Sequence, residues 1–245
     1  MKLNVTRLGE GPIIRPKMDG RMGTNINGPS LIRAPDWLPN PLGRYYLYFA
    51  HHNGTYIRLA VSDSLTGPWR MHEAGVLDLA DSYFIDHIAS PDIYIDDDAQ
   101  KIRLYFHGRT GYKPDGSQIQ GTRVAESSDG LNFTIHEPDI GPAYFKVFQQ
   151  NGAYFALARS AELLSSPDGF QLFESFGVPE GFPANIRHVA LWRRSATEMT
   201  VFHTVIGEAP EVIYACTFHM DGDPSDWRAD ESVEVLRPER AFEGA

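Results

Sequence analysis

Cysteine, basic residues and long apolar runs are scarce in this sequence of 245 residues. The single cysteine, Cys216, excludes an intramolecular disulfide. No activating residue is adjacent to it in the strand-like run 212–218, so we expect an inert buried thiol. The 22 lysines and arginines against 32 acidic residues give a net charge of −10. This balance disfavours a nucleic-acid surface, which needs a basic stripe, and docking on an anionic membrane.

Apolar runs of membrane-spanning length are also missing. No run approaches the roughly 18 residues that a membrane-spanning helix needs, and residues 1–11 contain no apolar core of signal-peptide length. We therefore expect a soluble, cytoplasmic protein, although a leader removed earlier would leave the same sequence. The signatures of dinucleotide loops, phosphate loops and hydrolase nucleophile elbows are absent as well.

Glycine and proline, in contrast, are frequent, with 22 and 17 residues. They interrupt the chain so often that no regular element can be long, which disfavours helical bundles. Four segments share one pattern, in which a tyrosine-rich or aliphatic strand is followed by a short loop and a second strand. The first strands start at Tyr45, Ile102, Ala153 and Met199, which are 57, 51 and 46 residues apart.

Each of these segments closes with a polar turn and one bulky aromatic residue. Strands bounded by Asp, Gly and Pro turns at such spacing are typical of propeller blades, because one four-stranded blade cannot bury both of its faces alone. The aromatic residue would then fill the wedge between neighbouring blades. A β-sandwich with incidental similarity is the alternative. The four closing residues are Trp69, Phe133, Phe170 and Trp227.

A further short strand precedes each segment and would be the innermost strand of its blade. A fifth set of strands starts near Val233–Leu236, but the sequence ends at Ala245, so the chain is either truncated within the last blade or closed by Val5–Ile14. We therefore predict an all-β fold of the five-bladed β-propeller type, a single domain over residues 1–245 with four complete blades and an incomplete fifth. The innermost strands are expected in Pro29–Ile32, Pro91–Ile95, Pro142–Val147 and Arg187–Trp192.

Three of these motifs resemble those of a known group of enzymes. In order along the chain, they are similar to motifs of the five-bladed propeller glycosidases of glycoside hydrolase family 43 and related families. The similarity covers most of residues 27–220 and implies a sugar-binding central cavity. In active members it implies three carboxylates that act as base, as pKa-tuning group and as general acid. The motifs are Pro29–Ile32 followed by Tyr45–Tyr48, then Ala89–Tyr94, then Ile140–Phe145.

The sequence departs from this group at all three carboxylate positions. Gly28-Pro29 stands where the first aspartate would lie, Gly141-Pro142 replaces the second, and the region 186–188 replaces the glutamate. An inverting glycosidase needs an acid and a base about 6.5–9.5 Å apart, and these positions do not supply that pair. We therefore expect either a rearranged site or the loss of catalysis.

Blade topology would bring strand entries and second-strand ends to one axial opening, and polar residues recur at these places. Asp86 is the expected general base, and His188 or His203 is the expected proton donor, since a histidine titrates near neutral pH. The expected substrate-binding residues are His87, Asp92, His107, Arg123 and Arg187, with the arginines gripping an anionic or hydroxyl-rich group.

Each of these residues has a structural alternative. Asp92 would cap a strand or hold a loop, and Arg123 or Arg187 would form an internal ion pair with Asp86 or Asp92. A displaced acid could instead come from the fourth-blade loop, at Glu208 or Glu211.

We therefore expect a carbohydrate-active propeller, glycoside hydrolase-like with a rearranged His/Asp/Arg site. The alternative is a non-catalytic sugar-binding or scaffold propeller. The partner would be a carbohydrate or another small polar ligand, and no cofactor is required. The resemblance adds the option of a structural Ca²⁺ in the axial cavity, held by one histidine and several waters. Zinc is disfavoured because no histidine pair has helical ligand spacing, and Asp96–Asp98 is expected to be a solvated turn. The oligomeric state is left open.

Overall fold

The structure is a computed structural model that describes residues 3–244. Within this range the long elements are all β-strands, and the helical elements are short 3-10 turns. The predicted all-β class is therefore confirmed. The 3-10 turns are η1 (Leu79–Asp81), η2 (Arg159–Ala161), η3 (Pro224–Asp226) and η4 (Ala241–Glu243).

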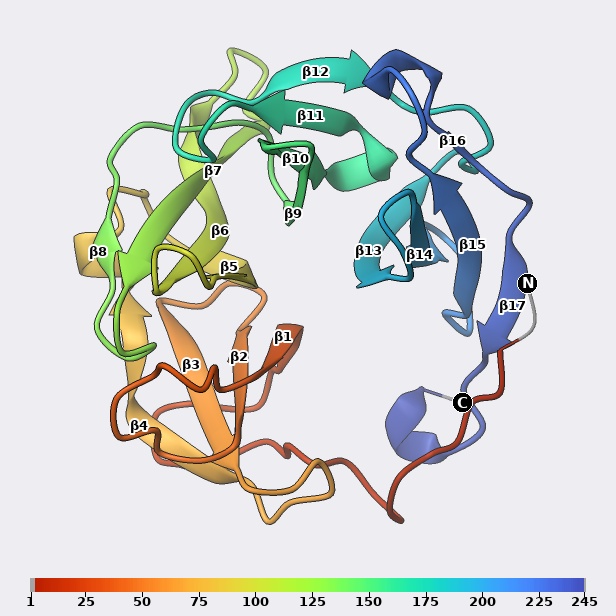
Figure 1. Cartoon of the computed structure of the whole chain (residues 1–245). Helices are drawn as coiled ribbons and strands as arrows, with labels where there is room; N and C mark the ends of the chain where they lie inside the picture. Colours follow the sequence, from red (N-terminus) through yellow and green to blue (C-terminus); the bar gives the residue numbers. More distant parts are fainter. Residues whose placement is uncertain (1–2, 245) are drawn as a thin grey trace. The chain divides into compact units, whose positions relative to one another are not determined.

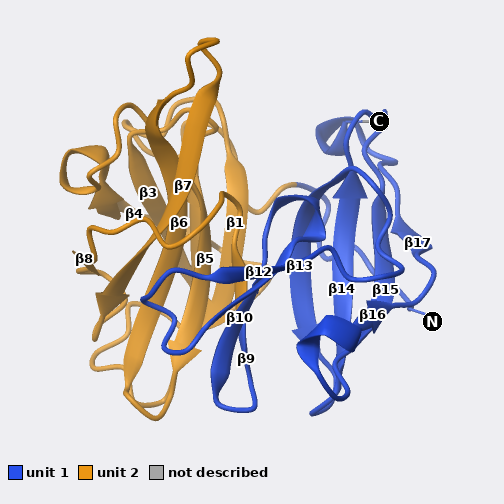
Figure 2. Cartoon of the chain, turned by 90° about the horizontal axis from the view of Figure 1, so that it is seen from above, with its two compact units in different colours: residues 1–11, 148–245 blue, residues 12–147 orange. Residues whose placement is uncertain are grey.

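Two compact units divide the chain, and each of them holds two antiparallel sheets (Figure 2). Unit 2 comprises Pro12–Val147, and unit 1 comprises the described residues of 1–11 and 148–245. The first four strands of each sheet follow chain order, so each pairs with the next one along the chain (Figure 1). This up-and-down order matches the pattern that repeats four times in the sequence.

The first sheet contains β1 (Asn27–Arg33), β2 (Tyr45–Ala50), β3 (Tyr56–Ser62) and β4 (Arg70–Asp78). The second contains β5 (Ile88–Asp96), β6 (Lys101–Tyr112), β7 (Gln118–Ser127) and β8 (Thr134–Ile135). The third contains β9 (Lys146–Gln150), β10 (Ala153–Leu157), β11 (Leu163–Ser166) and β12 (Glu174–Gly177). The fourth contains β13 (Ile186–Arg193), β14 (Glu198–Val205), β15 (Ile213–His219), β16 (Arg228–Ala229) and β17 (Val233–Leu236).

Two of the four closing aromatic residues, Phe133 and Trp227, pack against the neighbouring sheet of their own unit. In unit 2, the ring of Phe133 meets the ring of the fully buried Tyr48 edge-on at 6.2 Å, and the Tyr48 hydroxyl donates to the Gly130 carbonyl at 2.8 Å. In unit 1, Trp227 of the fourth sheet lies 4.7 Å from Phe155 of the third. At these two positions the wedge-filling role expected from the sequence is confirmed.

Two of the polar turns use the same hydrogen bonds, which explains why their sequences look alike. The Oδ1 atoms of Asp129 and Asp168 each accept hydrogen bonds from the backbone N–H groups two and three residues later, at 2.8–2.9 Å. Burial alone would raise the pKa of Asp129, but hydrogen bonds from Asn132, Leu131 and Ser127 together lower it to about 2. The turns therefore require an ionised aspartate at this place.

Two strand predictions need correction or stay open. The innermost strand of the third sheet spans Lys146–Gln150 and not Pro142–Val147, because Tyr144 has a left-handed φ of 70°, which a strand does not allow. The predicted fifth set of strands starts with Val233–Leu236, but this segment, β17, pairs with β15 in the fourth sheet. A fifth blade remains a prediction, as does the single domain over residues 1–245.

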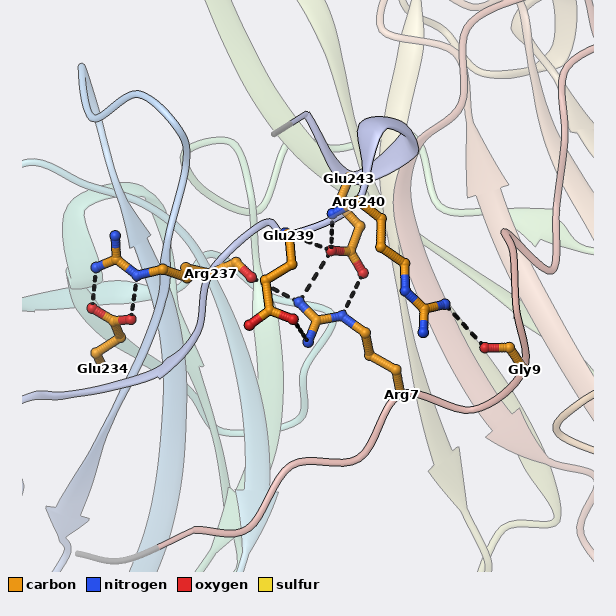
Figure 3. A network of polar contacts seen from close by, with 7 residues as sticks. All are labelled: Arg7, Gly9, Glu234, Arg237, Glu239, Arg240 and Glu243. Atoms are coloured by element: carbon orange, nitrogen blue, oxygen red, sulfur yellow. Dashed lines mark hydrogen bonds and ion pairs between the residues drawn. The ribbon is translucent and has the colours of Figure 1, made fainter.

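The N-terminal segment is fastened to the end of the chain by a network around Arg7 (Figure 3). The guanidinium of Arg7 donates to both carboxylate oxygens of Glu243 at 2.7 and 3.0 Å, and pairs with Glu239 at 3.0 Å. Arg240 in turn donates to the Gly9 carbonyl at 3.1 Å. The hydrogen bond from Arg7 is the main reason why the pKa of Glu243 falls to about 2.

We expect the Glu243→Gln variant to melt at a lower temperature than the wild-type protein at neutral pH. The pKa of Glu243 lies below its unfolded value of 4.5, so its stabilising effect is fully present above that value and is lost as the pH falls through about 2. Thermal unfolding followed by circular dichroism from about pH 7 to pH 2 would measure this. The difference should shrink below pH 4.5. Glu231→Gln, an exposed change in the same unit, is the control. A difference that persists unchanged at acid pH would contradict this account.

Candidate functional site

Asp86 and His87 lie directly before β5 in unit 2, and Asp86 is the exposed member of this pair. Nδ1 of His87 lies 2.8 Å from Oδ1 of Asp86, and the Arg109 guanidinium pairs with Oδ2. The Asp86 side chain is 38% exposed, whereas those of His87 and Arg109 are 6% and 12% exposed. Arg109 also donates to the hydroxyl of Tyr112 and lies 4.8 Å from its ring centre. The largely buried side chains of His87 and Arg109 thus hold the accessible carboxylate of Asp86.

His107 lies behind this pair, on β6. Its ring is 6.0 Å from that of His87 and 4.3 Å from that of Tyr144. The left-handed backbone of Tyr144 turns the chain just before β9. Within unit 2, the structure therefore brings together three of the predicted residues, Asp86, His87 and His107. Their place at an axial opening stays a prediction.

Arg123 on β7 is nine-tenths buried and has its own partners. Its Nε lies 3.0 Å from Oδ1 of Asp139, and its Nη1 donates to the Ser82 carbonyl at 2.9 Å. The guanidinium also lies 4.2 Å from the ring centre of Phe84. Arg123 thus ties the loop before β5 to the loop after β8.

Asp92 on β5 is buried and holds the start of β9. Its Oδ1 pairs with Nζ of Lys146 at 3.0 Å, and its Oδ2 accepts the backbone N–H of Val147 at 2.8 Å. These contacts favour the structural alternative for Asp92 over a direct contact with substrate.

The predicted residues of unit 1 lie on β13 and β14. Arg187 is exposed and pairs with Glu211 at 3.4 Å, while His188 is half-buried. His203 is 2% exposed, and its Nε2 lies 2.8 Å from Oγ of Ser232. Burial lowers the pKa of His203, so its imidazole is neutral near pH 7.

The structural alternatives predicted that Arg123 or Arg187 forms an ion pair with Asp86 or Asp92, and this prediction is wrong. Arg123 pairs with Asp139 and Arg187 with Glu211, and neither pairs with Asp86 or Asp92. Side chains that meet in this way are far apart in sequence or lie on loops, so periodicity alone does not identify them.

Arg109 was not among the predicted site residues, although its position in the sequence could have indicated it. Arg109 follows His107 by two positions on a strand, which places both side chains on one face. That spacing could have identified Arg109 as a neighbour of the histidines. Lys146, Asp139 and Tyr112 carried no comparable signal.

Glycines stand at two positions where the resemblance places aspartates, and both are tightly packed. A Cβ at Gly28, whose φ is 56°, would lie 2.8 Å from the backbone of Ser90, and one at Gly141 would lie 2.5 Å from the Phe145 ring. An aspartate therefore does not fit at either position without local rearrangement.

The thiol of Cys216 is fully buried, as expected, and burial raises its pKa to about 11. Residues 3–244 contain no group of three or more His, Cys, Asp or Glu side chains that could hold a metal ion. The structural Ca²⁺ suggested by the resemblance, held by one histidine and several waters, stays a prediction.

Comparisons with known proteins place the chain in a family. No family model matches it. The uncharacterized protein R118 of Acanthamoeba polyphaga mimivirus is 32% identical over an alignment of 279 residues, which covers 100% of this chain and 77% of the viral protein. The chain belongs to the same family as R118. Because R118 is uncharacterized, this relative shows the family of the chain but indicates no activity for it.

Several crystal structures resemble this member of the R118 family. One is a GH43 β-xylosidase/α-arabinofuranosidase from a compost metagenome in complex with xylotriose, with a TM-score of 0.64, 13% sequence identity and coverage of 91% of this chain and 81% of that one. Another is an endo-1,4-β-xylanase from Bacteroides thetaiotaomicron, with a TM-score of 0.64, 15% identity and coverage of 90% and 81%. A third is a GH43_1 enzyme from Xanthomonas citri complexed with xylose, with a TM-score of 0.63, 12% identity and coverage of 91% and 76%. At such low identity these likenesses show the fold alone, an all-β propeller with four blades present. None of the helices formed by residues 3–244 is long and apolar enough to cross a membrane.

Proposed function

We propose that this protein is a carbohydrate-active propeller whose ligand contacts the cluster of Asp86, His87 and Arg109. Two observations support the proposal. The fold is that of GH43 glycosidase propellers, two of which were crystallised with xylotriose and xylose. The observation that carries it in this chain is the accessible Asp86 carboxylate, held between two largely buried side chains.

The chemistry of this cluster suits a sugar. The Asp86 carboxylate accepts hydrogen bonds from hydroxyl groups, and the Arg109 guanidinium donates them to hydroxyl oxygens. The exposed ring of Tyr112, stacked near Arg109, offers an apolar face to the C–H groups of a pyranose or furanose ring. Acceptor, donor and apolar face thus lie within one short stretch of surface.

In the hydrolytic form of the proposal, Asp86 is the general base. A water molecule attacks the anomeric carbon and gives its proton to Asp86, while the glycosidic C–O bond breaks and the leaving oxygen takes a proton from an acid. The sequence predicts His188 or His203 as that acid, and both lie in unit 1. Of the two, the half-buried His188 is the more accessible, because His203 is 2% exposed. Of the other predicted residues, His87, His107 and Arg187 would bind or orient the substrate, whereas the contacts of Asp92 with Lys146 and of Arg123 with Asp139 favour a supporting role.

Sugar binding without catalysis is the second candidate. The close packing around Gly28 and Gly141 favours it, because the aspartates that the resemblance places there do not fit. A protein that kept the fold and the polar cluster would still bind hydroxyl groups but would lack the usual carboxylates.

A substrate screen separates these candidates. We would incubate the protein with nitrophenyl glycosides of xylose, arabinose and glucose and with xylo-oligosaccharides, between about pH 4 and pH 9, and measure binding of the same sugars by calorimetry. Release of nitrophenol supports the hydrolase. Saturable binding without release supports the binding protein, and the absence of both contradicts a carbohydrate function.

A further inference from the structure

A second polar cluster lies in unit 1, where β14 and β15 meet the loop between them. His203 and Tyr214 face each other across these strands, and their rings stack at 5.7 Å with 20° between the planes. The Tyr214 hydroxyl donates to Oε1 of Glu208 at 2.6 Å. The carboxylate of Glu208 is thus held in one orientation through one of its two oxygens.

The other oxygen of this carboxylate has no protein partner. In the part of the chain that the structure describes, Oε2 of Glu208 is buried without a hydrogen bond, and so is Nδ1 of His203. His203 is 2% exposed, so solvent reaches it poorly. Buried polar atoms are unfavourable unless a water molecule or a ligand supplies the missing partner.

Glu208 also differs from its acidic neighbours in forming no ion pair with any described residue, although Arg237, which binds Glu234, lies close enough for its charge to interact with that of Glu208. Glu211 pairs with Arg187 at 3.4 Å, and Glu234 binds two nitrogens of Arg237 at 2.6 and 2.5 Å. Among residues 3–244, no lysine, arginine or histidine forms an ion pair with Glu208. A half-buried carboxylate whose neighbours are already neutralised attracts a positive charge from outside.

We propose that Glu208, positioned by Tyr214, binds the ammonium group of a small amine-bearing ligand, and that this ligand is an amino sugar. The sugar part rests on the function proposed above, whereas the ammonium part rests on the Glu208 cluster alone. An ammonium group carries three donors. One would reach Oε2 of Glu208. Nδ1 of His203, in the tautomer whose Nε2–H donates to Ser232, is a further buried acceptor without a partner on the same strand pair.

Three probes and the wild-type protein test this assignment. Glucosamine and glucose differ mainly in one amine, and methylammonium carries the charge without the sugar. Titrations followed by calorimetry or by the NMR signals of Tyr214 should show glucosamine binding about tenfold more tightly than glucose, because the ammonium group forms an ion pair with the Glu208 carboxylate, whereas the glucose hydroxyl at the same place carries no charge. Added salt should reduce this difference.

Variants assign the effect to one residue. Glu208→Gln should remove the preference for glucosamine over glucose, whereas Tyr214→Phe should reduce the preference by releasing the carboxylate. Glu231→Gln, an exposed change near Ser232, should keep the full preference. Thermal melting would establish that each variant is folded.

The outcomes separate the two proposals. Equal binding of glucosamine and glucose overturns the ammonium site and supports the carbohydrate function. Methylammonium binding that depends on Glu208, without binding of either sugar, supports the ammonium site and contradicts the carbohydrate function. Binding of none of the three probes overturns the ammonium site, and with the negative screen above it overturns both.

Discussion

Replacing Asp92 by alanine is expected to lower the free energy of unfolding by about 3–5 kcal/mol, the usual cost of removing one partner from a buried ion pair. The substitution leaves the ammonium group of Lys146 and the backbone N–H of Val147 without the acceptors that they have at 3.0 and 2.8 Å. Asp92 is 8% exposed, so water does not readily replace its carboxylate.

Graded variants separate the charge from the hydrogen bond. Asp92→Asn retains an acceptor for the Val147 N–H but loses the charge that faces Lys146, so its destabilisation should be about half as large. The double variant Asp92→Ala with Lys146→Met removes both charges and should recover part of the loss. Asp98→Ala, in the exposed turn after β5, should change the stability by less than about 0.5 kcal/mol.

Urea unfolding followed by circular dichroism would measure these differences. If Asp92→Ala unfolds at the same urea concentration as the wild-type protein, Asp92 does not hold the start of β9. The contact with substrate expected from the sequence would then be the better account of this residue.

The strands and turns could be predicted from the sequence because their causes are local. A continuous run of buried aromatic and aliphatic side chains forms β2 over Tyr45–Ala50, close to the predicted run, and the aspartates at 129 and 168 bind the backbone of their own turns. The third innermost strand could not be placed, because its start depends on the left-handed backbone of Tyr144. Tyrosine adopts that conformation only where the surrounding structure imposes it.

The candidate site could be predicted only in part, for a related reason. Strand order was enough to bring Asp86 and His87 near His107, since neighbouring strands place these residues at one level. The partners that decide the role of each group come from elsewhere. Lys146 determines the structural role of Asp92, and Tyr214 orients Glu208. Such pairs depend on the tertiary fold, which carries no periodic signal in the sequence.

If the protein hydrolyses glycosides, Asp86→Asn is expected to reduce kcat/KM by about 10²–10⁴-fold, the usual contribution of a general base. The amide nearly matches the shape of the carboxylate and can still accept a hydrogen bond from Arg109, but it cannot take a proton from water. Because the Asp86 side chain is 38% exposed, the loss of its ion pair should cost less than about 1 kcal/mol of stability.

The size and kind of the effect identify what Asp86 does. A catalytic base predicts a large fall in kcat with little change in KM or melting temperature, together with loss of the acidic limb of the pH profile. A residue that only binds sugar predicts a rise in the dissociation constant of about tenfold and no effect on a pH profile of turnover. Asp98→Asn makes the same chemical change on the same unit at an exposed turn and should leave every quantity unchanged. An Asp86→Asn protein with wild-type turnover, affinity and stability would remove Asp86 from the site, and the search for the carboxylate would then move to Glu208.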